Sequence, residues 1–457
     1  MAFPIFKKSR YNILFEHKGE KFAFNSFTTA LNKVNDDFIN ILNSIGQIFD
    51  EEKTENQQLI SDMIKEGYLI NDDFDELKAL QFYNLNKKFN NDTFSLTLAP
   101  TLSCNFDCPY CYESAKHGTM GSAVKDKLLE FVEKNLKNKK YLNISWFGGE
   151  PLLAKEIIYD LSCKFIALCE KLGVEYSAKM VSNFYLADKE TINNLKKHKV
   201  TQVQVTIDGS EKIHNTRRKL KNSSEPTFNK ILDNIGKSKE IGIPIIIRIN
   251  ADKTNIDSIG ELVDILSQRN LKDCYIYLGH TTIFDECCPT KFSKECFTNS
   301  DFAVQSIDFA KLLAEKGFKN IVNVMYPTVV PFHCSAECLN AFIVGPSGEL
   351  YKCENEIGET EKCVGSIFHD NNSHAELLGT KEAMAGMNWL LCSPFEDKIC
   401  RDCNVLPLCM GGCSIFKKKL LKPYCMPWKY NLIDTLKLKC HNYQLTKEKS
   451  DLHINVC

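Results

Sequence analysis

The sequence has no long hydrophobic run and no segment typical of a secretory signal. A membrane-spanning helix needs about 18 or more consecutive apolar residues, and no such stretch occurs in the 457 residues. The first residues also lack the charged segment and following apolar run of about 7–15 residues that mark a signal peptide. These absences predict a cytoplasmic protein without a membrane partner.

The chain also lacks an excess of charge of either sign, since 57 Lys and Arg residues stand against 58 Asp and Glu residues. Nucleic-acid-binding domains concentrate positive charge on one face or along one helix. A nucleic-acid partner held through its phosphates is therefore not expected. No internal repeat of about 20–50 residues is present, which argues against solenoids and propellers.

Residues 1–90 contain no cysteine, although the whole chain contains 21. An odd number of cysteines in a reducing cytoplasm does not fit a disulfide framework and indicates metal binding or catalysis. A tight cysteine triplet lies in residues 91–325, and cysteines are dense after residue 330. Because domains usually have about 100–200 residues, we expect three domains, 1–90, 91–325 and 326–457.

The cysteine-free segment predicts a hairpin followed by compact helices. Strands are expected at Tyr11–Glu16 and Lys21–Phe24, a helix from Asn35–Asp37 onward, and a second helix over Leu59–Ile64 that ends at Gly67. This order predicts a small winged-helix-like module. The alternative is that the segment is a packing extension of the next domain.

The middle of the chain alternates strand-like runs with amphipathic helical patterns. The six strand-like runs are Phe94–Ala99, Asn143–Phe147, Ser177–Val181, Thr201–Ile207, Pro244–Ile249 and Cys274–Leu278. Such alternation implies right-handed crossovers and a parallel sheet. Six units fall short of the eight that close a barrel, so we expect an α/β fold with a partial (β/α)6 TIM-like barrel. Its chemistry should lie beyond the C-terminal ends of the strands.

Three cysteines, Cys104, Cys108 and Cys111, lie within eight residues after the first of these strands. A structural zinc ion needs four protein ligands and leaves no open position. Three thiolates without a nearby fourth ligand fit a [4Fe-4S] cluster in which one iron can bind a reactant. The alternative is a zinc site completed by a distant residue.

The spacing CX3CX2C, with Tyr110 before the third cysteine, resembles the signature of the radical S-adenosylmethionine (SAM) superfamily. The resemblance implies that Cys104, Cys108 and Cys111 are catalytic and hold a [4Fe-4S] cluster whose open iron chelates SAM. It further implies that one electron cleaves SAM to a 5′-deoxyadenosyl radical. We expect this electron to come from a donor such as flavodoxin or ferredoxin.

Four later segments resemble SAM-binding motifs of the same superfamily: GGEP, a polar pair after the third strand, S-x-D-G…H-x-x-R, and R-x-N. Phe184 stands where the family often has glycine. The resemblance implies that the cofactor is bound by Gly148, Gly149, Glu150, Pro151, Ser182, Asn183, Asp208, Arg217 and Arg248. Without the resemblance, Asp208 and Arg248 would more often form a structural ion pair.

The C-terminal cysteines follow the pattern CX3CX9GX4C, then CX2CX5CX3C, then one further cysteine. Eight thiolates suffice for two clusters, whereas four of them could make a zinc site. The pattern resembles the SPASM domain, which holds auxiliary iron–sulfur clusters. The resemblance implies a first auxiliary cluster on Cys334, Cys338, Cys353 and Cys413, and a second on Cys400, Cys403, Cys409 and Cys425. Cys440 is the alternative to Cys425.

These features together resemble a radical SAM/SPASM peptide maturase of the sactipeptide or ranthipeptide type. In such maturases a leader peptide adds a strand to the recognition module, so a leader is expected to bind residues 1–90. The expected reaction forms Cys thioether cross-links in a ribosomally made precursor peptide. The alternatives are a carbon–carbon cross-linking maturase and an anaerobic sulfatase-maturating enzyme. A zinc-dependent DNA-binding protein is the alternative from another class, but Lys65 is the sole cation of the second predicted helix.

Overall fold

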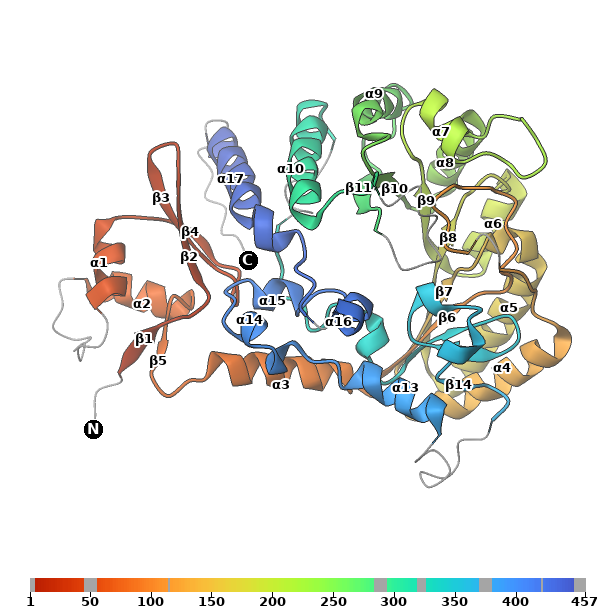
Figure 1. The fold of residues 1–457 in the computed structure, drawn as a ribbon, viewed down its shortest axis with the longest axis horizontal. Helices are drawn as coiled ribbons and strands as arrows, with labels where there is room; N and C mark the ends of the chain where they lie inside the picture. The colour runs from red at the N-terminus through yellow and green to blue at the C-terminus, as the bar shows by residue number, and fades with distance from the viewer. Residues whose placement is uncertain are drawn as a thin grey trace.

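The computed structural model describes seven segments of the chain: 5–44, 56–113, 116–282, 294–318, 326–369, 380–420 and 422–447. The molecule is elongated, with the N-terminal module at one end and a β/α domain at the other (Figure 1). Every helix within these segments is too short or too polar to span a membrane.

Six parallel strands lie side by side in chain order and form the predicted partial barrel. They are β6 (Thr93–Leu98), β7 (Tyr141–Trp146), β8 (Glu175–Ser182), β9 (Val200–Thr206), β10 (Ile245–Ala251) and β11 (Tyr275–His280). Each overlaps one of the runs expected from the sequence. The prediction of an α/β fold with a partial six-stranded barrel is therefore confirmed.

The strands alternate between a buried apolar face and a polar face. Phe94, Leu96 and Leu98 of β6 and Trp146 of β7 belong to the main apolar core. Helices on the outer side of the sheet cover this face (Figure 1). They are α4 (Ser122–Asn135), α5 (Lys155–Leu172), α6 (Lys189–Lys197), α8 (Phe228–Ile241) and α9 (Ile259–Gln268). The opposite face lines the inside of the barrel.

The sheet continues beyond β6 into the cysteine-rich C-terminal segment. Strand β12 (Ala341–Val344) pairs in parallel with β6, and β13 (Glu349–Tyr351) and β14 (Gly365–Ser366) follow antiparallel. The result is one sheet of nine strands. Strands from both sides of the expected boundary at residue 325 thus share a sheet, and that boundary stays a prediction.

The N-terminal segment forms the expected hairpin and two helices. Strands β2 (Asn12–His17) and β3 (Glu20–Asn25) pair antiparallel, and β4 (Leu31–Val34) adds a third strand that the sequence pattern did not indicate. Helices α1 (Asp36–Ser44) and α2 (Gln57–Lys65) pack on one face of this sheet. The structure thus contains the small strand-and-helix module expected before the barrel.

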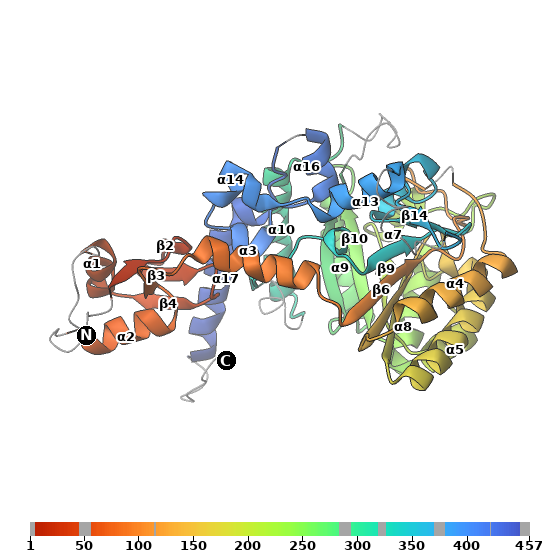
Figure 2. The same ribbon diagram turned by 90° about the horizontal axis from the view of Figure 1, so that it is seen from below.

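The other face of the module packs against the C-terminal segment. Phe15 belongs to an apolar cluster with residues of α17 (Trp428–Lys447). Helix α3 (Glu76–Lys88) runs beside the same segment (Figure 2) and ends in a buried ion pair of 3.7 Å between Lys88 and Glu337. The N-terminal segment is therefore also a packing extension, although of the C-terminal region rather than of the barrel. The boundary at residue 90 stays a prediction.

Candidate functional site

The cysteine triplet lies in the loop that follows the C-terminal end of β6. Two isolated β-bridges anchor this loop, from Thr101 to Thr119 and from Phe106 to Leu220. The backbone N–H of Phe106 also donates to the Sγ atom of Cys104 over 3.4 Å. The loop is therefore fixed on both sides of the first cysteine.

The glycines of the GGEP segment are required by the backbone of the cysteine loop. A Cβ atom on Gly148, whose φ is +112°, would lie 2.3 Å from the carbonyl oxygen of Thr101. On Gly149 it would lie 2.4 Å from the carbonyl oxygen of Leu102. The end of β7 thus meets the residues that lead into Cys104, and only glycine permits this approach.

The Glu150 carboxylate joins the GGEP segment to the end of β8. It is fully buried and accepts hydrogen bonds from the Ser182 hydroxyl (2.8 Å) and from the backbone N–H groups of Asn183 (2.7 Å) and Leu152 (3.0 Å). Burial raises the pKa of Glu150, while these hydrogen bonds oppose that rise. Pro151 begins the short 3-10 helix that follows. The structure therefore brings four of the predicted SAM-contact residues together, with the Glu150 side chain satisfied by protein groups.

Phe184, which stands where the resembling motif has glycine, adopts a backbone conformation that favours glycine. Its φ is +62°, in the left-handed region, which costs a residue with a side chain about 1–2 kcal/mol. The Phe184 ring is fully buried in the barrel core, and Asn234 donates to its carbonyl oxygen over 3.0 Å. Apolar burial and this hydrogen bond offset the strain, so the chain keeps the loop shape without glycine.

Replacing Gly149 by alanine is expected to displace the cysteine loop, because the new Cβ atom would overlap backbone that cannot move independently. Overpacking of this kind costs about 1–3 kcal/mol of folding free energy. The Gly149→Ala protein should therefore melt at a lower temperature and bind less iron per chain than the parent.

Gly236→Ala is the matched control for this substitution. Gly236 lies within α8, and a Cβ atom added there would meet no other atom within 4 Å. Alanine at this position should therefore be neutral or stabilising by about 1 kcal/mol. Equal melting temperatures and iron contents for both variants would contradict the tight contact at Gly149.

Asp208 and Arg217 lie close together beneath the cysteine loop. The fully buried Asp208 carboxylate accepts a hydrogen bond from the Tyr110 hydroxyl and lies 3.6 Å from Nε of Arg217. Arg217 also binds both carboxylate oxygens of Asp252, at 3.2 and 2.6 Å. The ion-pair partner of Asp208 is thus Arg217 rather than Arg248. This network holds Tyr110, which lies between two of the predicted cluster ligands.

Arg218 is a residue of this region that the sequence did not single out. It is 8% exposed, and its guanidinium donates to the Tyr110 hydroxyl over 2.7 Å. Its charge acts to lower the pKa values of Cys108 and Cys111. The Nε atom of Arg218 has no hydrogen-bond partner within the described residues. A buried cation with an unused N–H donor beside three thiols is suited to bind an anionic ligand. The position of Arg218 next to Arg217 in the sequence gave no indication of this role.

The thiols of the triplet fit a metal–sulfur centre. Burial raises the pKa of Cys104 to about 12 and that of Cys108 to about 11. Thiolates at such positions need a strong positive charge, which bound metal supplies. No group of three or more His, Cys, Asp or Glu side chains in the described segments closes around one metal ion. The ligands of an iron–sulfur cluster attach to separate irons, and the assignment of the triplet to such a cluster stays a prediction.

Arg248 faces the C-terminal region from the inside of the barrel. Its Nε atom donates to the side chain of Asn250 over 2.8 Å. Its charge also acts on Glu354, whose pKa burial raises and Arg248 lowers. Glu354 directly follows Cys353 and acts electrostatically on Tyr112 of the cysteine loop. Glu354, which belongs to no recognised sequence motif, therefore connects Arg248 of the barrel, the cysteine loop and the C-terminal Cys353.

The structure brings the four cysteines of the first predicted auxiliary set together. Cys334 acts electrostatically on Cys338 and Cys353, and Cys413 acts on Cys334. Burial raises the pKa of Cys334 to about 11. Cys334, Cys353 and Cys413 also pack against one apolar cluster of Ala336, Trp389 and Ile415, and shared ligation by the four cysteines stays a prediction.

The cysteines of the second predicted set also lie together. The pKa of Cys409 is raised to about 12, first by burial and then by Cys403, Cys400 and Cys425. Cys440 instead lies 4% exposed within the apolar cluster between α17 and the N-terminal sheet. The structure thus favours Cys425 over Cys440 as the fourth member of this set.

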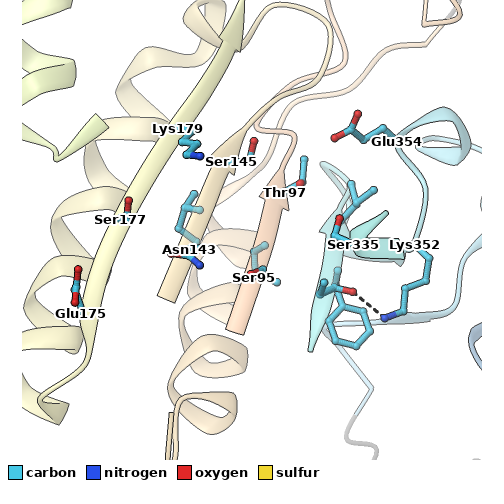
Figure 3. Close-up of a pocket in the computed structure, with 15 residues that line it drawn as sticks. Ser95, Thr97, Asn143, Ser145, Glu175, Ser177, Lys179, Ser335, Lys352 and Glu354 are labelled. Atoms are coloured by element: carbon cyan, nitrogen blue, oxygen red, sulfur yellow. Dashed lines mark hydrogen bonds between the residues drawn. The ribbon is translucent and has the colours of Figure 1, made fainter. Parts of the chain in front are cut away.

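A cavity of about 600 Å³ lies between the barrel and the C-terminal region. Strands β6, β7 and β8 form one wall, and Ser335, Lys352 and Glu354 lie on the other (Figure 3). Ser335 and Glu354 directly follow Cys334 and Cys353. The first C-terminal cysteine set therefore adjoins a cavity, and one of the strands that line this cavity, β6, leads into the loop of the cysteine triplet.

Comparison with known sequences identifies the barrel region. Residues 98–266 match the family model described as the Radical SAM superfamily. The cysteine-type anaerobic sulfatase-maturating enzyme of Clostridium novyi is 24% identical over 342 residues, which cover 70% of this chain and 88% of the relative. A probable GTP 3′,8-cyclase of Saccharolobus solfataricus is 21% identical over 311 residues, covering 64% of this chain and 93% of the relative.

Two solved structures resemble the fold over different lengths. The structure of anSMEcpe with bound AdoMet superposes with a TM-score of 0.56 at 18% identity and covers 76% of this chain and 99% of its own. Streptococcus suis SuiB bound to precursor peptide SuiA gives a TM-score of 0.50 at 15% identity and covers 93% of this chain and 98% of its own. The fold thus resembles both, and the SuiB chain spans more of this one.

Proposed function

We propose that this chain, a radical SAM enzyme that uses a [4Fe-4S] cluster and SAM, oxidises a ribosomally made precursor peptide and forms Cys thioether cross-links in it. The cavity between the barrel and the C-terminal region is the observation that carries this proposal. One wall consists of β6, which leads to the triplet loop, with β7 and β8, and the other includes Ser335 and Glu354, which follow Cys334 and Cys353. A peptide segment there would lie between the barrel strands and the first C-terminal cysteine set.

Different residues of the barrel would bind the cluster and SAM. Cys104, Cys108 and Cys111 would hold the catalytic cluster, and the backbone of the GGEP segment, with Ser182 and Asn183, would border SAM. When bound, the cluster and SAM supply a 5′-deoxyadenosyl radical, which removes hydrogen from an unactivated carbon. The Asp208–Arg217 pair keeps Tyr110, and with it the triplet loop, in place.

The C-terminal cysteines would hold two auxiliary clusters. Joining a thiol sulfur to a carbon removes two hydrogen atoms, which is a net two-electron oxidation. The radical accepts one hydrogen atom, so a proton and one electron remain to be removed. Buried thiolate-bound clusters are suitable electron acceptors, and Ser335 and Glu354 place the first set at the cavity wall.

A leader peptide is proposed to bind the N-terminal module by adding a strand to the edge of the β2–β4 sheet. SuiB, solved with its precursor peptide, covers 93% of this chain, whereas anSMEcpe covers 76%. The broader match supports a peptide maturase with a recognition module. Turnover also requires a reductant, for which a flavodoxin or ferredoxin is proposed.

Sulfatase maturation is the second candidate, because 88% of the Clostridium novyi sulfatase-maturating enzyme aligns with this chain. Both candidates are tested with anaerobically reconstituted enzyme, SAM and reductant. The substrates are a cysteine-containing precursor encoded beside the gene and a sulfatase-derived cysteine peptide. We expect the precursor to lose two hydrogen atoms per cross-link and to lose alkylatable cysteine, as measured by mass spectrometry. Conversion of the sulfatase peptide alone would reject the thioether proposal in favour of the second candidate.

A further inference from the structure

The inside of the partial barrel is polar where the cavity lies. On β6, β7 and β8, buried apolar residues alternate with solvent-accessible ones. The accessible residues that line the cavity on these strands are Ser95, Thr97, Asn143, Ser145, Glu175, Ser177 and Lys179 (Figure 3). A closed barrel fills its interior with packed branched side chains, so this interior is built to hold a ligand instead.

Lys179 is the cation of this strand wall. It is level with Ser145 of β7, which is level with Thr97 of β6, so its nearest neighbours across the strands are neutral. Its side chain is exposed to the cavity, and its ammonium group makes no hydrogen bond or ion pair within the described part of the chain. Glu175 lies four residues away on β8, roughly 13 Å along the strand.

The wall opposite the strands carries two further charged groups, Lys352 and Glu354. Lys352 donates to the carbonyl oxygens of Cys338 (2.7 Å) and Ala341 (2.8 Å). Glu354 experiences the charge of Arg248. Within the described residues no hydrogen bond or ion pair joins Lys179 to Glu354 or to Glu175, and the side chains beside it on the strand wall carry hydroxyl and amide groups.

The backbone around Lys179 is irregular as well. The pairing of β8 with β9 shifts register between Ala178 and Lys179, so that Thr201 is skipped. The Thr201 hydroxyl donates to the carbonyl oxygen of Ala178 over 3.0 Å. The extra residue thus belongs to β9, and β8 keeps its regular alternation of buried and accessible residues. That alternation places Lys179 on the cavity side of β8.

We propose that Lys179 determines substrate specificity by binding a carboxylate of the peptide segment that is modified. The inference rests on the proposed function, because it assumes that a peptide enters the cavity. A carboxylate that reaches Lys179 exchanges water for an ion pair in a partly enclosed cavity, where charges interact more strongly than at an open surface. The carboxylate belongs to an Asp or Glu side chain or to the C-terminus of the peptide.

The test uses reconstituted enzyme with SAM and three short synthetic peptides that each contain one cysteine. The first is amidated and contains Asp, the second is amidated with Asn in its place, and the third is the Asn peptide with a free C-terminal carboxylate. Binding is measured by isothermal titration calorimetry. We expect the parent to bind the Asp peptide about five- to tenfold more tightly than the amidated Asn peptide, as one new ion pair allows. The third peptide shows whether a terminal carboxylate serves equally.

Variants at Lys179 test whether this residue causes the preference for the Asp peptide. Lys179→Met should remove it, Lys179→Arg should keep it, and Lys179→Glu should reverse it. Lys189→Met, on the exposed surface of α6, is the control and should leave it unchanged. SAM affinity should be the same in all variants, because Lys179 and the predicted SAM contact Ser182 lie on opposite faces of β8, roughly 10 Å apart along the strand.

The outcomes separate this inference from the proposed function. An equal Asp to Asn preference in the parent and in Lys179→Met, or a loss of SAM affinity in Lys179→Met, would overturn the role of Lys179 alone. Failure of every peptide to bind the parent would also overturn the role of Lys179, whereas the proposed function is decided separately by conversion of the full precursor.

Discussion

Replacing Cys104, Cys108 or Cys111 by alanine is expected to abolish the reductive cleavage of SAM. The three thiols lie in one anchored loop, and burial raises their pKa values, so each would be held as a thiolate by the cluster itself. Loss of one cysteine leaves two ligands for the cluster. Even a mutation of a residue that only hydrogen-bonds to a metal ligand lowers metal affinity or activity about 10–100-fold. The yield of 5′-deoxyadenosine from dithionite-reduced enzyme should therefore fall by more than about 100-fold.

Cys163→Ala provides the control for these three variants. Cys163 is exposed on α5, outside all three predicted ligand sets, and hydrogen-bonds to His198 at 3.3 Å. Its replacement should leave both SAM cleavage and iron content unchanged. The triplet variants should still bind the iron of the C-terminal sets. Parental 5′-deoxyadenosine yields from all three triplet variants would reject the assignment.

The strands of the barrel could be predicted because their signals are local. Alternation of apolar and polar residues repeats within each run, and the triplet follows the first run directly. In parallel strands the C-terminal ends meet at one edge, which brings Cys104, Glu150 and Ser182 together. The division of the C-terminal cysteines into two sets came from the resemblance to the SPASM domain. Members of each set influence one another electrostatically, and the ligand sets stay a prediction.

Features that depend on contacts between distant segments could not be predicted. Helix α3 buries Glu76, Asn84 and Lys88 beside the single apolar residue Leu80, so its inward face is mostly polar and gives little amphipathic signal. The partners that satisfy these side chains lie far away in the chain, as with Asn84 and the carbonyl oxygen of Pro331 at 2.6 Å. The pairing of β12 with β6 and the position of Glu354 depend on the same long-range packing.

Replacing Cys403 and Cys409 together by serine is expected to abolish peptide cross-linking. If the second C-terminal set holds a cluster, the double variant should lose about four irons per chain while the SAM-binding cluster remains. SAM cleavage should continue, but peptide cross-linking should stop, because the surplus electron of the two-electron oxidation has lost its route away from the substrate. The measurements are iron content, 5′-deoxyadenosine yield and the mass of the peptide from one reaction.

A purely structural role of these cysteines is the alternative, since metal binding can itself supply folding free energy. The packing of the N-terminal module on this loop is consistent with that alternative: the Ser26 hydroxyl donates to the carbonyl oxygen of Asn404, and Arg10 lies 3.8 Å from Asp402. Cys425→Ser tests the same cluster from a loop outside that contact, and Cys363→Ala is the control for loss of an unassigned thiol. A variant at either ligand position that stays folded, cleaves SAM and still cross-links peptide at the parental rate would eliminate the electron-acceptor role. If both variants lose cross-linking and keep SAM cleavage, electron transfer rather than folding has been lost. A chain without its C-terminal packing would also lose the pairing of β12 with β6, the strand that leads into the catalytic loop.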